Sequence, residues 1–478
     1  MLLRNIGYLA GSQVTTWVVS LLYIVIVTRA IGPRSNGELS AATAFYGILV
    51  PLAALGTSTY LVKEIAGDPA RAPRLVASAL TVKLLALPPA IAVVTAYLIV
   101  SHFSREMTIV FILFGAGLIP SLCSPALQAA LQGIQRMGAI ALSGILNSLV
   151  YDTVAIVLVL LGHRNVILIA SLLLATMYVS MLVTVAIYRR HFTAEWKVRL
   201  RDVLSVIRGG FPFLATQVAY TLYVGADTVI LTSLSSSTEV GWYGAVSRLF
   251  SSLLFVSTIL STVWLPRMSA HARHDPAALR RETQLVFRLA LLSAVPLAVG
   301  GSLVASRLVH LFWGHAYAGA SAPMSVLLLA LPATSISTVL YSVLVARGRA
   351  GTWAWVMAVA LALNVIANIG LVLWFRSEGR STALAAALCL NLTEAGMAVV
   401  AIWIGRHQLG LGMLWYSVRA VAAGLLMGGV VMLLAHLPLA VVIMAGALVF
   451  CPLAVAFRLV TGPDVAAVRG LLSKVLHR

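Results

Sequence analysis

Asp227 and Arg248 are the ionisable residues whose positions point most directly to chemistry. They lie inside the apolar segments 209–233 and 241–266, where a charge is costly and usually serves a function. The two segments read as consecutive antiparallel helices. With a rise of about 1.5 Å per residue, both side chains should lie roughly 10 Å from the same membrane face. They can therefore pair with each other or line one cavity, and a purely structural ion pair between neighbouring helices is the alternative.

Arg248 indicates an anionic ligand. A guanidinium keeps its charge in any protein environment and binds phosphate through paired donors. Arg29 and Arg34 flank the outer end of the first predicted helix and can extend a positive surface there. Alternatively, both arginines simply reach toward the interface with their charged ends.

Polar residues on the first and seventh predicted helices can offer hydrogen bonds to sugar hydroxyls: Gln13, Gln217, Tyr220 and Tyr223. Together with Arg248, Asp227 and Arg29, the residues Gln13, Gln217 and Tyr223 make up the predicted substrate cavity. Polar side chains that hold neighbouring helices together would give the same pattern.

Three carboxylates lie within predicted spans and are candidates for ion coupling: Asp152, Asp227 and Glu394. Burial shifts the pKa of a carboxyl group toward a range in which it can exchange a proton, and a carboxylate can also hold Na⁺. Each could equally accept hydrogen bonds from Ser, Thr or Asn on a neighbouring helix. Asp227 is preferred because the first helix of each half should line the cavity.

The motifs of nucleotide hydrolysis and metal catalysis are absent from the sequence. The chain contains no GxxxxGK[ST] phosphate loop and no HExxH, which argues against ATP hydrolysis and zinc catalysis. His271 and His274 lie in a basic segment without acidic or Cys partners at metal spacing. Cys123, Cys389 and Cys451 all fall within predicted spans and form no CxxC. We therefore expect no cofactor, no metal site and no enzymatic activity.

The composition is that of a membrane protein. Hydrophobic residues make up 61% of the 478 and charged residues 10%, and the mean hydropathy is +1.00. Runs of about 20 apolar residues can each span the bilayer. The chain has about fourteen, near 7–29, 38–62, 77–101, 108–131, 139–161, 166–188, 209–233, 241–266, 286–310, 322–346, 352–375, 381–405, 415–436 and 438–460. This predicts an all-α, multi-pass integral membrane fold.

The net charge of +19 follows membrane topology. With the N-terminus placed in the cytoplasm, most Lys and Arg fall on the cytoplasmic side, as the positive-inside rule requires. The basic stretches 189–208 and 267–288, expected to be loops, carry much of this excess and can contact anionic lipids. Both termini are then cytoplasmic, and the basic balance indicates orientation and lipid contact rather than a nucleic-acid partner.

The chain divides into two related halves. A slide of 204 positions aligns Gln13 with Gln217 and Gly37 with Gly241, within the same helix–turn–helix layout. An even number of helices per repeat predicts two six-helix bundles related by an axis along the membrane normal. We expect an N-terminal bundle over 1–188, a basic cytoplasmic linker over 189–208, a C-terminal bundle over 209–405, and two extra helices with a tail over 406–478.

The opening of the chain resembles polysaccharide-export flippases of the Wzx type, in the superfamily of MATE exporters and the lipid II flippase. The resemblance is carried by a polar-tinged first helix, the turn R-x-[IL]-G-P-x-x-x-G at 29–37, the segment 56–64, and Gly-Trp-Tyr at 241–243. It implies a transporter that moves a polyprenyl-pyrophosphate-linked glycan across the bacterial inner membrane through a cationic cavity. Arg29 and Arg248 fit such a cavity, whereas Asp227 would partly neutralise it.

The implied partners are the lipid-linked glycan, membrane lipids, and polysaccharide polymerase or export proteins. A MATE-type multidrug or cation exporter is an alternative, although an unpaired arginine in its cavity would repel a cation. A lipid II flippase is a second alternative. A membrane glycosyltransferase, polymerase or ligase is a third, but such enzymes need a substantial outer loop, and the outer loops expected in this chain are short.

Overall fold

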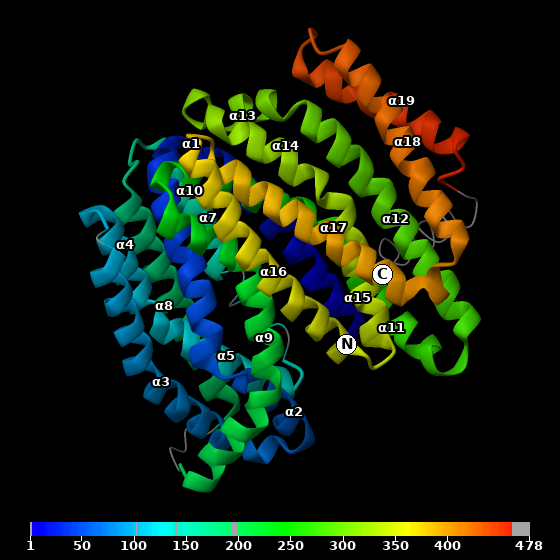
Figure 1. Cartoon of the computed structure of the whole chain (residues 1–478). Helices are drawn as coiled ribbons and strands as arrows, with labels where there is room; N and C mark the ends of the chain where they lie inside the picture. The colour runs from blue at the N-terminus through cyan, green and yellow to red at the C-terminus, as the bar shows by residue number, and fades with distance from the viewer. Residues whose placement is uncertain are drawn as a thin grey trace. The chain divides into compact units, whose positions relative to one another are not determined.

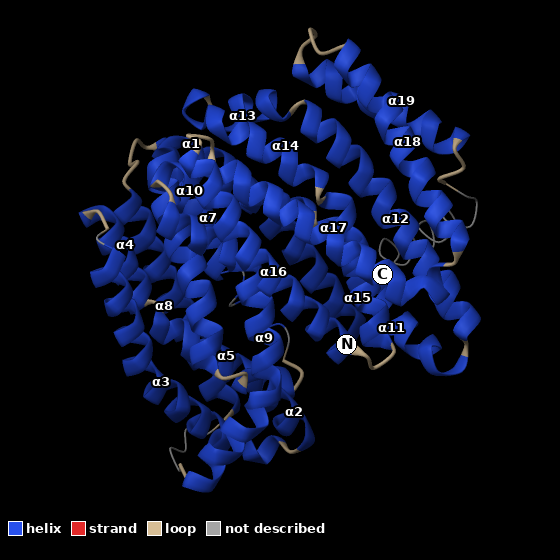
Figure 2. Cartoon of the chain, viewed as in Figure 1, coloured by secondary structure: helices blue, strands red, loops and turns tan. Residues whose placement is uncertain are grey.

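The fold is built of helices joined by short turns. The computed structural model describes residues 2–460 apart from 102, 137, 139–141, 143, 145 and 193–197, and these residues contain no strand (Figure 2). The chain divides into two compact units, Met1–Gly241 and Trp242–Arg478. Figure 1 shows the helices in chain order with their labels.

The described α-helices of the first unit that precede α10 are α1 (Leu2–Ala54), α2 (Thr57–Gly67), α3 (Ala72–Ser101), α4 (Arg105–Ala116), α5 (Leu118–Gly133), α7 (Tyr151–Leu160), α8 (Val166–His191) and α9 (Leu200–Leu234). A short 3₁₀ helix, η1 (Pro69–Arg71), precedes α3, and a π-helical turn, η2 (Leu146–Val150), precedes α7. α1 packs against α4, α7 and α9, and α5 packs against α2, α3 and α8.

The second unit begins within α10 and continues to the C-terminus. Its described elements are α10 (Ser237–Leu253), α11 (Phe255–His274), α12 (Pro276–Leu303), α13 (Ala305–Trp313), the 3₁₀ helix η3 (His315–Ala320), α14 (Ser321–Leu329), α15 (Leu331–Ala346), α16 (Ala350–Ser377), α17 (Thr382–Leu409), α18 (Leu411–Leu433) and α19 (Leu439–Ala456). α12 contacts α11, α14, α15 and α18, while α17 contacts α14, α15 and α16. The last two helices, α18 and α19, lie side by side (Figure 1).

The chain is a multi-pass membrane protein. Ten helices of the described part are long and apolar enough to cross a bilayer, or eleven if the bent pair His315–Leu329 and Leu331–Ala346 forms one span. The all-helical fold is therefore confirmed. The expected total of fourteen spans, and their grouping into two six-helix bundles, stay predictions.

Several expected spans contain breaks that hydropathy does not predict. Segment 38–62 divides between α1 and α2 at Leu55 and Gly56, which both have positive φ. Segment 108–131 divides at Gly117, and segment 241–266 divides at Leu254. The predictions of loops over 189–208 and 267–288 are wrong where helices extend into these stretches. Residues 200–208 belong to α9. The stretch 267–288 is helical except near Asp275, because α11 continues to His274 and α12 begins at Pro276.

Backbone segments of the two repeats approach each other closely at Gly37 and Gly241. Gly32, with φ 80°, bends α1. Farther along α1, a Cβ atom on Gly37 would lie 1.7 Å from the carbonyl oxygen of Ser237, and one on Gly241 would lie 1.8 Å from that of Pro33. Gly37 and Gly241 are 204 positions apart, as are Pro33 and Ser237. The contact is thus reciprocal under the offset that aligned the repeats, which supports the relation of these two turns.

The boundary between the compact units follows Gly241. In the first unit, α9 packs against α1, α2 and α3. The division proposed from sequence, with bundles over 1–188 and 209–405 and additions after 405, stays a prediction.

Candidate functional site

α9 carries three of the predicted cavity residues. Asp227 is 3% exposed and Tyr223 is buried, whereas Gln217 is exposed. α9 packs against α1, α2 and α3, so its buried carboxylate lies within the helix packing of the first unit. Asp227 and Tyr223 are thus placed as interior residues, and Gln217 is not.

The predicted residues of α1 are placed differently from one another. Arg29 is exposed, three residues before the bend at Gly32. Arg34 is also exposed, and its Nε lies 3.8 Å from Oε1 of the buried Glu38. The side chain of Gln13 lies outside the described residues. An exposed Arg29 agrees equally with the cavity surface and with the interfacial alternative.

Arg248 is half-buried on α10. It lies close enough to the buried Tyr317, in the 3₁₀ helix η3, for its charge to act on that hydroxyl. Trp242 fixes the same two elements together. Its indole Nε1 donates to the carbonyl oxygen of Ala316 at 3.2 Å, and its ring lies where a Cβ on Gly319 would be only 2.3 Å away. These Trp242 contacts hold α10, the helix that carries the Arg248 cation, against η3.

The predicted pairing of Asp227 with Arg248 joins residues of different compact units. Asp227 belongs to Met1–Gly241 and Arg248 to Trp242–Arg478. Their helices follow each other directly, since α9 ends at Leu234 and α10 begins at Ser237. The consecutive helices are as expected, and the pairing itself stays a prediction.

Asp152 lies in a buried polar cluster between α1 and α7. Its Oδ2 accepts a hydrogen bond from the hydroxyl of Ser20 at 2.5 Å. One residue earlier, the Tyr151 hydroxyl lies 2.8 Å from the Tyr23 hydroxyl. The π-helical turn η2 immediately precedes this pair, and such turns often occur at functional sites. The Ser20 hydroxyl thus gives the Asp152 carboxylate one polar neighbour of the kind that a proton or a small cation would use.

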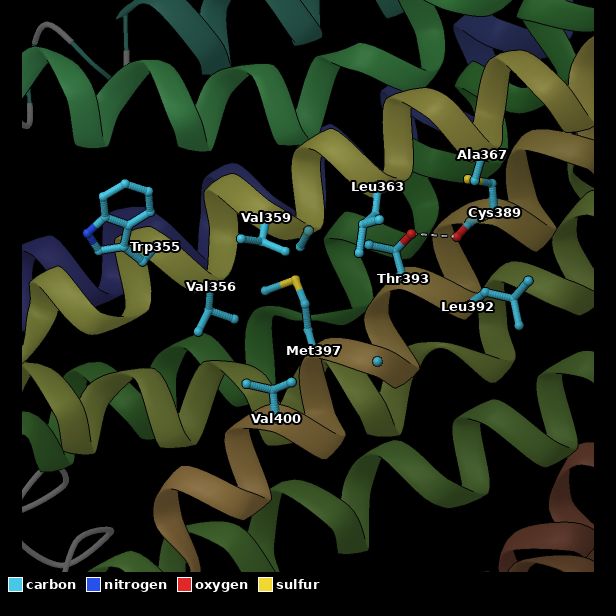
Figure 3. A pocket seen from close by; sticks show the side chains of 12 residues that line it. Trp355, Val356, Val359, Leu363, Ala367, Cys389, Leu392, Thr393, Met397 and Val400 are labelled. Carbon is cyan, nitrogen blue, oxygen red and sulfur yellow. Dashed lines mark hydrogen bonds between the residues drawn. The ribbon is translucent and has the colours of Figure 1, made fainter.

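Glu394 is 4% exposed on α17, beside polar residues that join α17 to α16. The Asn364 amide donates to the Thr393 hydroxyl at 3.3 Å, and the Cys389 thiol donates to the Asn364 carbonyl oxygen at 3.4 Å. The Thr393 hydroxyl in turn donates to the Cys389 carbonyl oxygen at 2.8 Å (Figure 3). These hydrogen bonds join α16 and α17 next to Glu394 in sequence, and the role of Glu394 itself stays a prediction.

An apolar cavity of about 560 Å³ lies between α16 and α17. Val356, Val359 and Leu363 of α16 approach Met397 and Val400 of α17 across it (Figure 3). The polar groups of its lining are the Trp355 indole, Thr393 and Cys389, and the last two hydrogen-bond within the protein. The cavity suits a hydrocarbon chain and lacks groups that would select one.

Two buried charges were missed by the sequence analysis. Lys83 is fully buried on α3, and its Nζ donates to the Leu122 carbonyl oxygen at 2.8 Å and to Ser58 Oγ at 3.4 Å. Glu38 is also fully buried and accepts from the Ser104 hydroxyl at 3.1 Å. Lys83 lies inside the predicted span 77–101, so the signal that pointed to Arg248 was present. Glu38 coincided with the start of a predicted span, where a charge is unremarkable.

In the described part of the chain, no group of three or more His, Cys, Asp or Glu side chains is placed to hold a metal ion. What the arrangement offers is a half-buried cation and several buried carboxylates within apolar helices. These can hold an anion and exchange a proton or bind a single cation without covalent chemistry.

Sequence comparison matches residues 2–271 to the family described as "Polysaccharide biosynthesis protein", and residues 212–369 to the family "MatE". No curated protein matches the chain. Among solved structures, the lipid II flippase MurJ in an inward closed conformation is similar over 94% of this chain and 98% of its own, with 13% identity and a TM-score of 0.75.

Multidrug exporters share the same fold. An inward-facing MATE transporter of the MOP superfamily covers 84% of this chain and 98% of its own, with 14% identity and a TM-score of 0.67. A MOP-superfamily transporter from Pyrococcus furiosus covers 84% and 94%, with 15% identity and a TM-score of 0.51. At these identities the structures indicate a common fold.

Proposed function

From the premise that the chain belongs to the polysaccharide biosynthesis protein family, we propose that it flips a polyprenyl-pyrophosphate-linked oligosaccharide across the bacterial inner membrane. The observation that carries this proposal is the family match over residues 2–271. The MOP-superfamily fold supports transport by alternating access. The glycan would move from the cytoplasmic to the outer leaflet for surface polysaccharide export.

Arg248 is the proposed contact for the pyrophosphate. A guanidinium grips phosphate oxygens with paired donors and cannot lose its charge. The side chain is half-buried on an apolar helix, and a partly buried charge attracts an anion more strongly than the same charge in water. Arg29 at the bend of α1 and Tyr223 on α9 are further proposed cavity residues, with the sugars in a wet cavity and the lipid tail in the bilayer.

Ion coupling is proposed to use a buried carboxylate, with Asp227, Asp152 and Glu394 as candidates. Among them, Asp152 has the hydroxyl of Ser20 in direct contact. A carboxylate that alternates between a bound ion and this hydroxyl could link ion movement to the resetting of the carrier. Polysaccharide polymerase or export proteins are the proposed protein partners, and cytoplasmic termini follow from the charge asymmetry.

The leaflet distribution of lipid-linked glycans tests the function. The gene is deleted in the native bacterium, and an impermeant enzyme or label that modifies the glycan is applied to spheroplasts. We expect glycan to accumulate in the protected cytoplasmic leaflet while surface polysaccharide is lost, with recovery when the wild-type gene is restored. An unchanged distribution and unchanged surface polysaccharide would contradict the proposal.

A lipid II flippase is the second candidate, favoured by the structural match that extends over 94% of the chain. Both substrates carry a pyrophosphate, so Arg248 would serve either. Expression of this protein in cells depleted of their own lipid II flippase separates the two: restored growth favours lipid II. The MatE match over residues 212–369 makes drug export the third outcome, which new sensitivity of the deletion strain to cationic drugs would reveal.

A further inference from the structure

A second cavity, whose lining includes both polar and apolar residues, lies wholly within the first unit. It has a volume of about 520 Å³, and its polar lining residues are Ser58, Thr59 and Lys63 of α2 and Gln128 and Gln132 of α5. The lining positions on each helix recur at spacings that place them on one face. α2 and α5 are packed against each other, so these two faces form opposing walls of the cavity. The polar groups of the lining are therefore hydroxyls, amides and one ammonium.

A buried lysine, Lys83, lies behind the α2 wall of the cavity. Lys83 is fully buried, and its Nζ donates to Ser58 Oγ at 3.4 Å and to the Leu122 carbonyl oxygen at 2.8 Å. Neither acceptor is a carboxylate. An ammonium carries three N–H donors, so the third has no acceptor among the described residues. Because Ser58 lines the cavity, a single hydroxyl separates this ammonium from the cavity.

The electrostatics of the cavity favour an anion. Lys63 is an exposed residue of the cavity lining, and no carboxylate is among the described lining residues. The acidic residues near these helices have cationic partners of their own: Glu64 lies 3.3 Å from Arg71, and Asp202 lies 2.7 Å from Arg74. The first turn of α2 contributes Ser58 and Thr59, and the N-terminus of a helix adds further positive potential. An anion in the cavity would supply the missing counter-charge of Lys83.

Lysine is itself an uncommon choice in this chain. Only four of its 33 basic residues are lysines, at positions 63, 83, 197 and 474. Two of the four are at this cavity. A lysine ammonium is a compact point charge that binds phosphate. Topology would be satisfied equally well by arginine, so the need for positive charge on one membrane face does not account for this choice.

We propose that the cavity between α2 and α5 binds the phosphate of a phosphorylated lipid headgroup. Lys63 contacts the phosphate directly, Ser58 donates its hydroxyl hydrogen to it while accepting from Lys83, and the amides of Gln128 and Gln132 bind adjacent polar groups. The headgroup comes either from the transported polyprenyl-pyrophosphate glycan, which rests on the proposed function, or from an anionic phospholipid. The cavity belongs to the first unit, whereas Arg248 belongs to the second.

Inorganic pyrophosphate is the probe. Its binding to the full-length protein in phosphatidylcholine nanodiscs is measured by calorimetric titration, for the wild type and for Arg248→Ala. Binding that remains in Arg248→Ala is assigned to the cavity. In that background we expect Lys63→Gln and Ser58→Ala to weaken binding about tenfold each, the loss of one charge-assisted or polar contact. Arg105→Gln is the matched control: it removes an exposed cation at the start of α4, outside the cavity lining, and should bind as the parent.

Lys83→Met tests the buried charge and should weaken binding similarly; if this variant does not fold, Lys63→Gln and Ser58→Ala decide. Absence of saturable binding, or equal affinity in Lys63→Gln, Ser58→Ala and Arg105→Gln, would overturn the proposal.

Two competitors identify the source of the headgroup. Competition by a short-chain polyprenyl pyrophosphate, with no effect of phosphatidylglycerol in the nanodisc, assigns the cavity to the transported lipid. Loss of pyrophosphate binding when phosphatidylglycerol is added assigns it to a phospholipid. Leaflet analysis of the deletion strain separates this proposal from the proposed function. Pyrophosphate binding at the cavity, together with a normal glycan distribution in the deletion strain, would support the binding site and contradict the flippase function. An altered glycan distribution without binding at the cavity would contradict the binding site alone.

Discussion

Arg248 combines a permanent charge with a half-buried position on an apolar helix. Holding a charge there is expensive unless something compensates it. A transported anion would do so during each cycle, and a neighbouring carboxylate would do so permanently. The two explanations differ in what happens when the arginine is removed, and this makes Arg248 the first residue to change.

Replacing Arg248 with alanine should lower flipping of a lipid-linked glycan by about tenfold to a hundredfold. A hydrogen bond to a charged group contributes about 1.5–3 kcal/mol, and each 1.4 kcal/mol corresponds to a factor of about ten. Arg248→Lys keeps the charge but loses the paired donors, so its rate should lie between those of the wild type and Arg248→Ala. The measurement is flipping in proteoliposomes, normalised to protein amount.

A double variant distinguishes transport from packing. If Asp227 serves only to neutralise Arg248, Arg248→Ala should lose abundance in the membrane, and Arg248→Ala with Asp227→Ala should regain it. If Arg248 binds substrate, both variants should be present at normal abundance and inactive. Normal transport in Arg248→Ala would remove this residue from the mechanism.

Asp152→Asn tests whether the cluster between α1 and α7 couples transport to an ion. Asparagine keeps an oxygen that accepts from Ser20, so the hydrogen bond seen at 2.5 Å can persist while the charge is lost. We expect stimulation of flipping by an imposed proton or sodium gradient to disappear, with downhill equilibration retained. Ser20→Ala, which leaves the carboxylate in place, should still respond to the gradient. Stimulation that survives in Asp152→Asn would assign coupling elsewhere.

At the scale of elements, hydropathy predicts which stretches are helical but not where they break. Leu55–Gly56, Gly117, Leu254 and the 40° bend at Ala330 interrupt runs that are apolar throughout, and an apolar run has no signal for a backbone break. Several prolines that could break helices, among them Pro51, Pro125 and Pro296, lie inside continuous ones, because neighbouring groups can satisfy the carbonyls that a proline frees.

The close contact between the two repeats predicts opposite effects on the melting temperature for alanine substitutions at two glycines of α1. A Cβ on Gly37 would meet the backbone carbonyl of Ser237 at 1.7 Å, whereas a Cβ on Gly47 would meet nothing within 4 Å. Gly47→Ala should therefore hold or raise the melting temperature, since alanine favours the helix by about 1 kcal/mol over glycine. Gly37→Ala should lower it, since overpacking against a backbone costs about 1–3 kcal/mol.

Thermal unfolding of the two variants in the same detergent provides the comparison. Gly241→Ala should behave like Gly37→Ala, because its Cβ would lie 1.8 Å from the Pro33 carbonyl oxygen. Equal stability of Gly37→Ala and Gly47→Ala would contradict the close backbone approach.

Candidate site residues show the same division between what sequence can and cannot predict. The burial of Asp152, Asp227 and Glu394 was predictable, because each acidic residue lies in an apolar run. Lys83 could have been found by the same reasoning. Its partners could not, because Ser58 and Leu122 come from other helices, and nothing in their local sequence marks them as neighbours of α3.

At the scale of the whole molecule, small residues pack α18 against α12 within the second unit, and a capped carbonyl links α18 to the end of α19. Gly424 and Gly428 of α18 lie against Val295 and Val299 of α12, the kind of close packing that drives helix association in a bilayer. The Arg419 guanidinium also donates to the Phe457 carbonyl oxygen at 3.1 Å. α18 and α19 therefore belong to the second unit, whereas the cavity between α2 and α5 belongs to the first.

A substitution between α12 and α18 should therefore affect stability without affecting pyrophosphate binding at the α2–α5 cavity. Gly424→Ile places a branched side chain where a Cβ alone would lie 2.6 Å from Val295 Cγ1, which should cost about 1–3 kcal/mol of stability. Gly429→Ile makes the same change on the same helix, where a Cβ meets nothing within 4 Å, and should unfold at nearly the wild-type temperature.

Both variants should bind inorganic pyrophosphate as the wild type does, once Arg248→Ala has removed the other proposed phosphate contact. Weaker binding in Gly424→Ile alone, at a temperature where it is fully folded, would mean that packing around α18 controls the cavity of the other unit. The additional helices would then act on substrate binding as well as on stability.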